Sequence, residues 1–171
     1  VRGIRTPFRL EKTLTLRAEQ AALFVEERLT NEGGQPLHAM WGQHIAFGNP
    51  LLRDGARIFA PAGRLIAHGT IPGYEPRCFA PGSESAWPPA IAPDGTKVDA
   101  SVVPPHGEIR AQEMAYLTDL RDGWYVLVNP AHRVGFGLRF DAALYRYLWL
   151  WQQLGEVATG YPWWGRLHTV A

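Results

Sequence analysis

The sequence predicts an all-β protein built as a large antiparallel β-sandwich. Apolar and polar side chains alternate along several segments, which is typical of strands with one buried face. Many of the 14 prolines and 18 glycines fall in residues 53–107, where they interrupt strands. No long segment carries apolar residues at helical spacing. Strands joined by Pro- and Gly-rich connections favour a sandwich over alternating strands and helices.

The first predicted element is a pair of strands in residues 12–30. The alternating apolar residues are Leu14 and Leu16, then Leu23, Val25 and Leu29. Residues 19–28 also contain Ala, Glu and Gln, which favour a helix, so a helix there is the alternative. Asn31-Glu32-Gly33-Gly34 predicts a turn, and a further strand is expected over residues 37–47.

The later part of the chain predicts more strands. They span residues 112–120, 124–128, 134–140 and 145–152, and residues 163–170 also have an extended pattern. Residues 53–107 are expected to form ordered loops with short strands, and such loops often frame binding sites.

We expect residues 1–171 to be a single β-sandwich domain that is present only in part. The sequence opens on a strand-like stretch without Met and closes without a polar turn. A sandwich that lacks strands exposes edges and an apolar face, so we expect self-association or a missing remainder of the domain.

Composition excludes several classes of function. The 17 Lys and Arg balance the 16 Asp and Glu, and no basic run could follow a phosphate backbone, so nucleic acid is not an expected partner. Cys78 cannot close an intrachain disulfide, and neither a leader nor an apolar run of about 18 residues is found, so no membrane partner is expected. The cytoplasm is the predicted location.

The most informative segment is Met-Trp-Gly-Gln-His-Ile-Ala-Phe-Gly at residues 40–48, just after Thr30-Asn31. Together with residues 147–152 and 160–166, it resembles the carboxyl-terminal portion of the galactose mutarotase-like superfamily, in its bacterial aldose 1-epimerase-like branch. The resemblance spans nearly the whole chain in the same order. It implies a supersandwich fold, a sugar as the small-molecule partner, isomerase activity on a free aldose or derivative, and no cofactor.

His44 is the candidate catalytic residue. The resemblance implies that it is the general acid that protonates the ring oxygen of the sugar. Imidazole suits this task because its unperturbed pKa of about 6.5 lets it give and take a proton near neutrality. On the expected strand Gly42 shares its face and leaves room for a ring. A histidine packed in the sandwich interior is the alternative.

The histidines do not predict a metal site. His38 lies six positions from His44, about 20 Å along a strand, so the two cannot bind one ion. The remaining histidines lack ligand spacing and are expected to be loop or surface residues: His68, His106, His132 and His168.

Aromatic residues supply the candidate substrate-binding site. Trp149 and Trp151 fall on one strand face, where they form either a sugar platform or part of the core. The neighbouring amide of Gln152 can both donate to and accept from hydroxyls. The remaining candidates are Trp41, Gln43 and Arg166.

The general base is missing from the predicted site. The resemblance implies a glutamate on a late strand, following a segment like residues 164–170, and the sequence ends at Ala171. Glu156 is expected in a turn, and the glutamates that do not match this motif are Glu75, Glu84, Glu108 and Glu113. A non-catalytic carbohydrate-binding or regulatory domain on the same scaffold is therefore the alternative function. A hydrolase finds little support, because Gly82-Ser83-Glu84-Ser85 is not a nucleophile elbow.

Overall fold

The computed structural model describes residues 1–72, 77–155 and 168–171. Within these ranges the protein is all-β, with thirteen strands, antiparallel pairing in every sheet and no helix. The chain divides into two compact units, Val1–Gly42 and Gln43–Ala171. In the described ranges, no helix is long and apolar enough to cross a bilayer.

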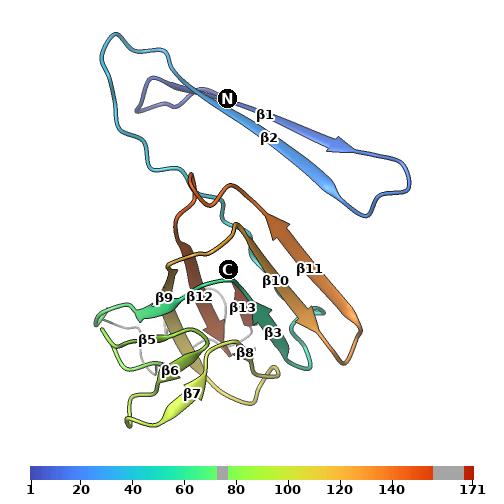
Figure 1. Cartoon of the computed structure of the whole chain (residues 1–171), viewed down its shortest axis with the longest axis vertical. Helices are drawn as coiled ribbons and strands as arrows, with labels where there is room; N and C mark the ends of the chain where they lie inside the picture. Colours follow the sequence, from blue (N-terminus) through green and yellow to red (C-terminus); the bar gives the residue numbers. More distant parts are fainter. Residues whose placement is uncertain (73–76, 156–167) are drawn as a thin grey trace. The chain divides into compact units, whose positions relative to one another are not determined.

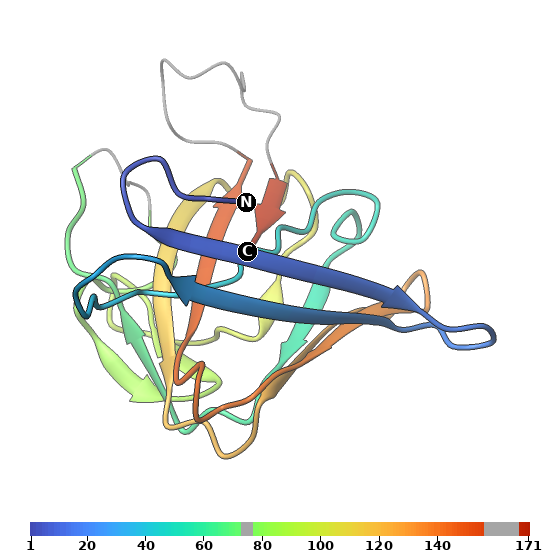
Figure 2. The ribbon, with the colours of Figure 1, turned by 90° about the horizontal axis from the view of Figure 1, so that it is seen from above.

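The first unit is a long β-hairpin. β1 (Phe8–Leu16) and β2 (Leu23–Asn31) run side by side over their whole length (Figures 1 and 2). This confirms the predicted pair of strands. The helical alternative over residues 19–28 is wrong, because β2 pairs with β1 over its whole length and Glu19 (φ 62°) lies in the turn.

The hairpin has one apolar face. Opposite residues of an antiparallel pair point to the same side, and the register pairs Leu14 with Val25 and Leu16 with Leu23. These four side chains are 49–77% exposed. Further along the same face, Lys12 Nζ forms an ion pair with Glu27 at 2.8 Å.

The strand expected over residues 37–47 is wrong. This segment forms no ladder, and only Phe47 pairs, through an isolated bridge to Val170 with N···O distances of 2.8 and 3.1 Å. A strand forms where a neighbouring strand pairs with its backbone, and residues 37–46 form no such ladder in the described structure.

The second unit contains two larger sheets (Figure 1). The four-stranded sheet has the order β11 (Val134–Arg139), β10 (Trp124–Asn129), β3 (Ala56–Phe59), β8 (Val102–Val103). The five-stranded sheet has the order β13 (His168–Val170), β12 (Leu148–Leu154), β9 (Ala111–Thr118), β4 (Arg64–Ala67), β5 (Glu84–Ala86). A small sheet joins β6 (Pro89–Ile91) to β7 (Lys97–Asp99).

Both larger sheets contribute to one buried core. Ile58 and Leu127 come from the four-stranded sheet, while Leu65, Leu117 and Leu150 come from the five-stranded sheet. Two antiparallel sheets that bury apolar residues in a shared cluster are consistent with the predicted β-sandwich.

β9, β10 and β11 confirm the strands predicted over residues 112–140. β12 begins three residues later than expected, because residues 141–145 form a turn instead. In this turn the carbonyl oxygen of Asp141 accepts from the amide N–H groups of Leu144 (3.2 Å) and Tyr145 (2.9 Å).

Candidate functional site

One side of the five-stranded sheet carries a row of aromatic residues. The register pairs Trp149 with Tyr116 and Trp151 with Met114, so all four side chains point to the same side. Tyr116 is in turn paired with Ile66 of β4. We call this surface the aromatic face, and it consists of Ile66, His68, Met114, Tyr116, Trp149 and Trp151.

The rings of the aromatic face contact one another. Trp149 is 56% exposed, and its ring meets Tyr116 edge-on, with centroids 5.4 Å apart and an interplanar angle of 80°. Tyr116 also contacts His68, with ring centroids 5.8 Å apart. The result is an apolar surface that also carries the polar atoms of indole, phenol and imidazole groups. This arrangement can hold a flat ligand that has both C–H patches and hydroxyls.

The opposite side of β9 holds a buried ion pair. Glu113 is 0% exposed, and its two oxygens accept five hydrogen bonds. Nε and Nη2 of Arg77 donate two of them, and the backbone N–H groups of Cys78 (3.1 Å), Phe79 (2.9 Å) and Met114 (2.9 Å) donate the others. These five donors occupy both carboxylate oxygens and leave them little capacity to bind a substrate hydroxyl.

Arg77 connects this ion pair to the aromatic face. Its Nη2 donates to the carbonyl oxygen of His68 at 3.2 Å, and its Nη1 donates to the carbonyl oxygen of Gly69 at 3.3 Å. The ring nitrogen Nδ1 of His68 lies 3.1 Å from the same Gly69 oxygen. Glu113, Arg77 and Gly69 therefore fix the backbone from which the His68 ring projects.

Cys78 is not a nucleophile at neutral pH. Burial and, to a smaller extent, the charge of Glu113 raise the pKa of its thiol to about 12, although the guanidinium of Arg77 acts to lower it. Because the thiolate is the reactive form, a thiol with this pKa stays inert near pH 7.

Comparison with known families decides the family of the chain. Residues 2–162 match the family model DUF4432, whose description is a domain of unknown function. The chain belongs to the DUF4432 family. No curated protein and no solved structure matches the chain. The DUF4432 description assigns no activity.

The predicted site residues in and around the segment of His44 fall into different units. His44 and Gln43 lie in the second unit, outside any strand, and both are exposed. The imidazole of His44 forms no hydrogen bond with another described residue. Trp41 belongs to the first unit, where its indole Nε1 donates to Glu27 at 3.1 Å. The polar atom of this tryptophan is thus engaged within its own unit.

Gln152 lies on the opposite side of β12 from the two tryptophans. It pairs with Glu113 and is 2% exposed, and its Nε2 has no hydrogen-bond partner in the ranges that the structure covers. Consecutive strand residues point to opposite sides, so an amide directly after Trp151 cannot share its face. Gln153 is the amide on that side. Its side chain is buried, and Oε1 lacks a partner among the described atoms.

Of the remaining predicted residues, Trp149 and Trp151 do share one face, and Trp151 is half-buried. Arg166 lies outside the described residues. In the described ranges, no cluster of three His, Cys, Asp or Glu side chains could hold a metal ion.

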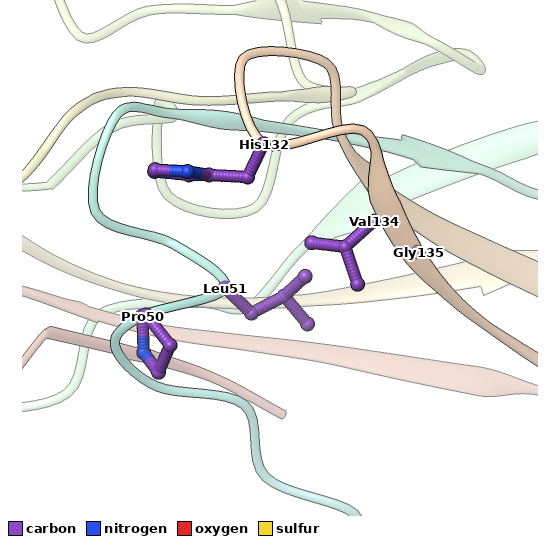
Figure 3. Close-up of a pocket in the computed structure, with 5 residues that line it drawn as sticks. All are labelled: Pro50, Leu51, His132, Val134 and Gly135. Atoms are coloured by element: carbon purple, nitrogen blue, oxygen red, sulfur yellow. The ribbon is translucent and has the colours of Figure 1, made fainter.

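A separate open pocket of about 330 Å³ lies beside the turn between β10 and β11 (Figure 3). It is lined by Pro50, Leu51, His132, Val134 and Gly135. Nε2 of His132 contacts Oδ2 of Asp54. The walls are otherwise apolar, and none of the site residues predicted from the sequence lines the pocket. It offers neither a flat aromatic surface nor a group of polar side chains, so the aromatic face is the stronger candidate in this DUF4432 protein.

Sequence reasoning missed Tyr116 and His68, and it set Glu113 aside. The alternation of Met114 and Tyr116 was visible, but only the register against β12 shows that they lie beside the tryptophans. For Glu113, the available signal is a glutamate within an otherwise largely apolar strand, where a charge requires a partner.

Proposed function

We propose that this DUF4432 protein binds a sugar on its aromatic face and is an aldose 1-epimerase-like isomerase on a galactose mutarotase-like fold. The substrate is a free aldose or a derivative of one. The observation that carries the proposal is the exposed ring of Trp149, which stands edge-on against Tyr116 in a row of aromatic side chains.

A pyranose suits such a surface. One face of the sugar ring presents C–H groups that pack on an indole, while the hydroxyls around its rim need donors and acceptors. A tryptophan that served only as core would be covered, whereas more than half of the Trp149 surface is accessible. This exposure favours a ligand platform over simple packing.

Anomer interconversion requires an acid and a base. In the proposed reaction His44 donates a proton to the ring oxygen, while a base removes the proton of the anomeric hydroxyl. The bond between C1 and the ring oxygen breaks, and an open-chain aldehyde forms. After rotation about the adjacent C–C bond the ring closes on the other face of the carbonyl, and both protons return.

The proposal assigns the acid but not the base. The glutamate that the resemblance implies has no match in this sequence. Glu113 is unsuited because its oxygens are occupied by Arg77 and three backbone N–H groups. A non-catalytic carbohydrate-binding or regulatory domain remains the alternative, and the occupied state of Glu113 favours it.

We further infer that the sandwich is completed by more chain or by a second copy. The exposed apolar face of the hairpin supports this, because soluble proteins cover large apolar surfaces.

A chain with a single cysteine, partly buried and unpaired, is compatible with the reducing cytoplasm as its location.

Polarimetry tests the reaction. In the complete protein, His44→Gln should slow mutarotation of the preferred aldose by about 10²–10⁴-fold while folding is kept, because general acid assistance is lost. His132→Gln, at a histidine remote in sequence that pairs with Asp54, is the matched control and should keep the wild-type rate. An unchanged rate in His44→Gln removes His44 from the mechanism. Sugar binding without any rate above buffer supports the non-catalytic alternative.

A further inference from the structure

We propose that His68 contacts the sugar on the aromatic face, that its Nε2 accepts a hydrogen bond from one hydroxyl, and that the ligand is a neutral aldose. This proposal rests on the proposed function and adds to it a specificity-determining residue and the charge class of the ligand.

The position of His68 supports a ligand contact. It is half-buried immediately after β4, on the same side as Ile66, with its ring 5.8 Å from that of Tyr116. Tyr116 in turn contacts Trp149. A sugar that lies across Tyr116 and Trp149 would therefore have the imidazole at its rim.

The hydrogen bonds of His68 define the free nitrogen. A carbonyl oxygen only accepts, so Nδ1 must donate its proton to Gly69, 3.1 Å away. In the neutral ring Nε2 then carries the lone pair. Within the described chain Nε2 has no hydrogen-bond partner. It is therefore an acceptor of fixed direction that is available to a sugar hydroxyl.

The backbone of His68 is held rigidly. Its amide N–H donates to Met114 O at 2.8 Å, and its carbonyl oxygen accepts from Arg77 and from the amide of Gly82. Arg77 is itself fixed by the buried carboxylate of Glu113. A side chain on such a support can discriminate between hydroxyl positions, because it cannot move to follow a misplaced one.

The charges bordering this face favour a neutral ligand. Arg64 lies on the same side of β4, two residues before Ile66. Its guanidinium is paired with both Glu84 and Asp119, each at 3.2 Å. A phosphate or carboxylate on the sugar would have to compete with two carboxylates for this cation, and it would meet their repulsion.

Calorimetric titration of the full chain tests the proposal. The probes are D-glucose, D-galactose, D-mannose and D-xylose, the 6-phosphates of the hexoses, and the monodeoxy analogues of whichever aldose binds best. We expect His68→Leu to weaken binding roughly 3- to 10-fold, the loss of one hydrogen bond. His68→Gln, whose amide reaches the Nε2 position, should retain more affinity than His68→Asn.

A thermodynamic cycle that combines the His68→Leu substitution with removal of one sugar hydroxyl identifies the hydroxyl that His68 contacts. We expect this for one hydroxyl only. The analogue that lacks it should bind the wild type more weakly than the parent aldose does, whereas His68→Leu should bind the analogue and the parent aldose equally well. His132→Leu is the matched control and should leave the whole panel unchanged. If His68→Leu does not fold, as judged by its thermal transition, the His68→Gln and His68→Asn pair carries the same comparison.

The outcomes separate the two claims. If an aldose binds, Trp149→Ala loses it and His68→Leu does not, the sugar-binding face stands and the role of His68 is wrong. Tighter binding of a hexose 6-phosphate than of its parent aldose overturns the neutral-ligand claim. If no probe binds the wild type, the proposed function and this inference both fail.

Discussion

Glu113 shows how one residue links the core to the candidate site. Burying a carboxylate is costly unless partners replace its water, and here Arg77 and three backbone N–H groups do so. The guanidinium of Arg77 also donates hydrogen bonds to the carbonyl groups of His68 and Gly69. The buried ion pair therefore fixes the backbone position of His68, whose ring belongs to the aromatic face.

Glu113→Gln should destabilise the protein by about 3–5 kcal/mol, because it leaves the guanidinium of Arg77 buried without a counter-charge. Glu84→Gln is the matched control. It removes an exposed partner of Arg64 and should cost about 0–1 kcal/mol. Urea unfolding of both variants measures the difference. Equal, small losses in the two variants would mean that the buried pair does not hold this part of the fold.

The residues of the site could be predicted only in part. Strand alternation was sufficient to place Trp149 and Trp151 on one side of β12. The same alternation places Gln152 on the other side, so the amide chosen from the sequence was wrong for that surface. Tyr116 and His68 could not be found in this way, since neighbours across a sheet depend on a register that a single sequence does not contain.

At the scale of elements, both the local apolar pattern and the available pairing partners decide which segments form strands. β9, β10 and β11 lie where the sequence predicts strands. Residues 37–47 do not form the expected strand, and Phe47 alone joins β13. The turn that opens at Asp141 delays the start of β12. These misses occur where turn hydrogen bonds or a missing partner outweigh an apolar pattern.

The turn between β10 and β11 depends on one buried amide. Asn129 is fully buried, its Nδ2 donates to Leu51 O at 2.8 Å, and its Oδ1 accepts from the N–H of His132 at 3.1 Å. Asn129→Ala should cost about 1–3 kcal/mol, because it leaves buried backbone groups unpaired.

Asn31→Ala is the control for this turn. Asn31 also makes two side-chain bonds to the backbone, at 2.8 and 2.9 Å, but it is exposed, so water can replace them and the loss should be smaller. Thermal unfolding compares the two variants. A larger loss for Asn31→Ala would show that burial is not what makes the Asn129 contacts important.

For the molecule as a whole, we predict that the hairpin packs against a second copy of the chain. A two-stranded hairpin is marginally stable in water without packing, and Leu14, Leu16, Leu23 and Val25 are exposed on one side of it. We predict that the chain self-associates in sedimentation, and that Leu14→Ser with Leu23→Ser reduces the association. The exposed polar pair Thr13→Ser and Thr15→Ser, on the other side of β1, is the control. A compact, monodisperse wild-type monomer would contradict this prediction.

The central claim is that a sugar binds on the aromatic face of the five-stranded sheet, and fluorine NMR of the chain labelled with 5-fluorotryptophan tests it most directly. Trp124→Phe, Trp149→Phe and Trp151→Phe assign the three relevant signals among the seven tryptophans. Saturation with the aldose should shift the signals of Trp149 and Trp151, while Trp124 of the four-stranded sheet stays in place. A shift confined to Trp124, or no shift at saturating sugar, would contradict the claim.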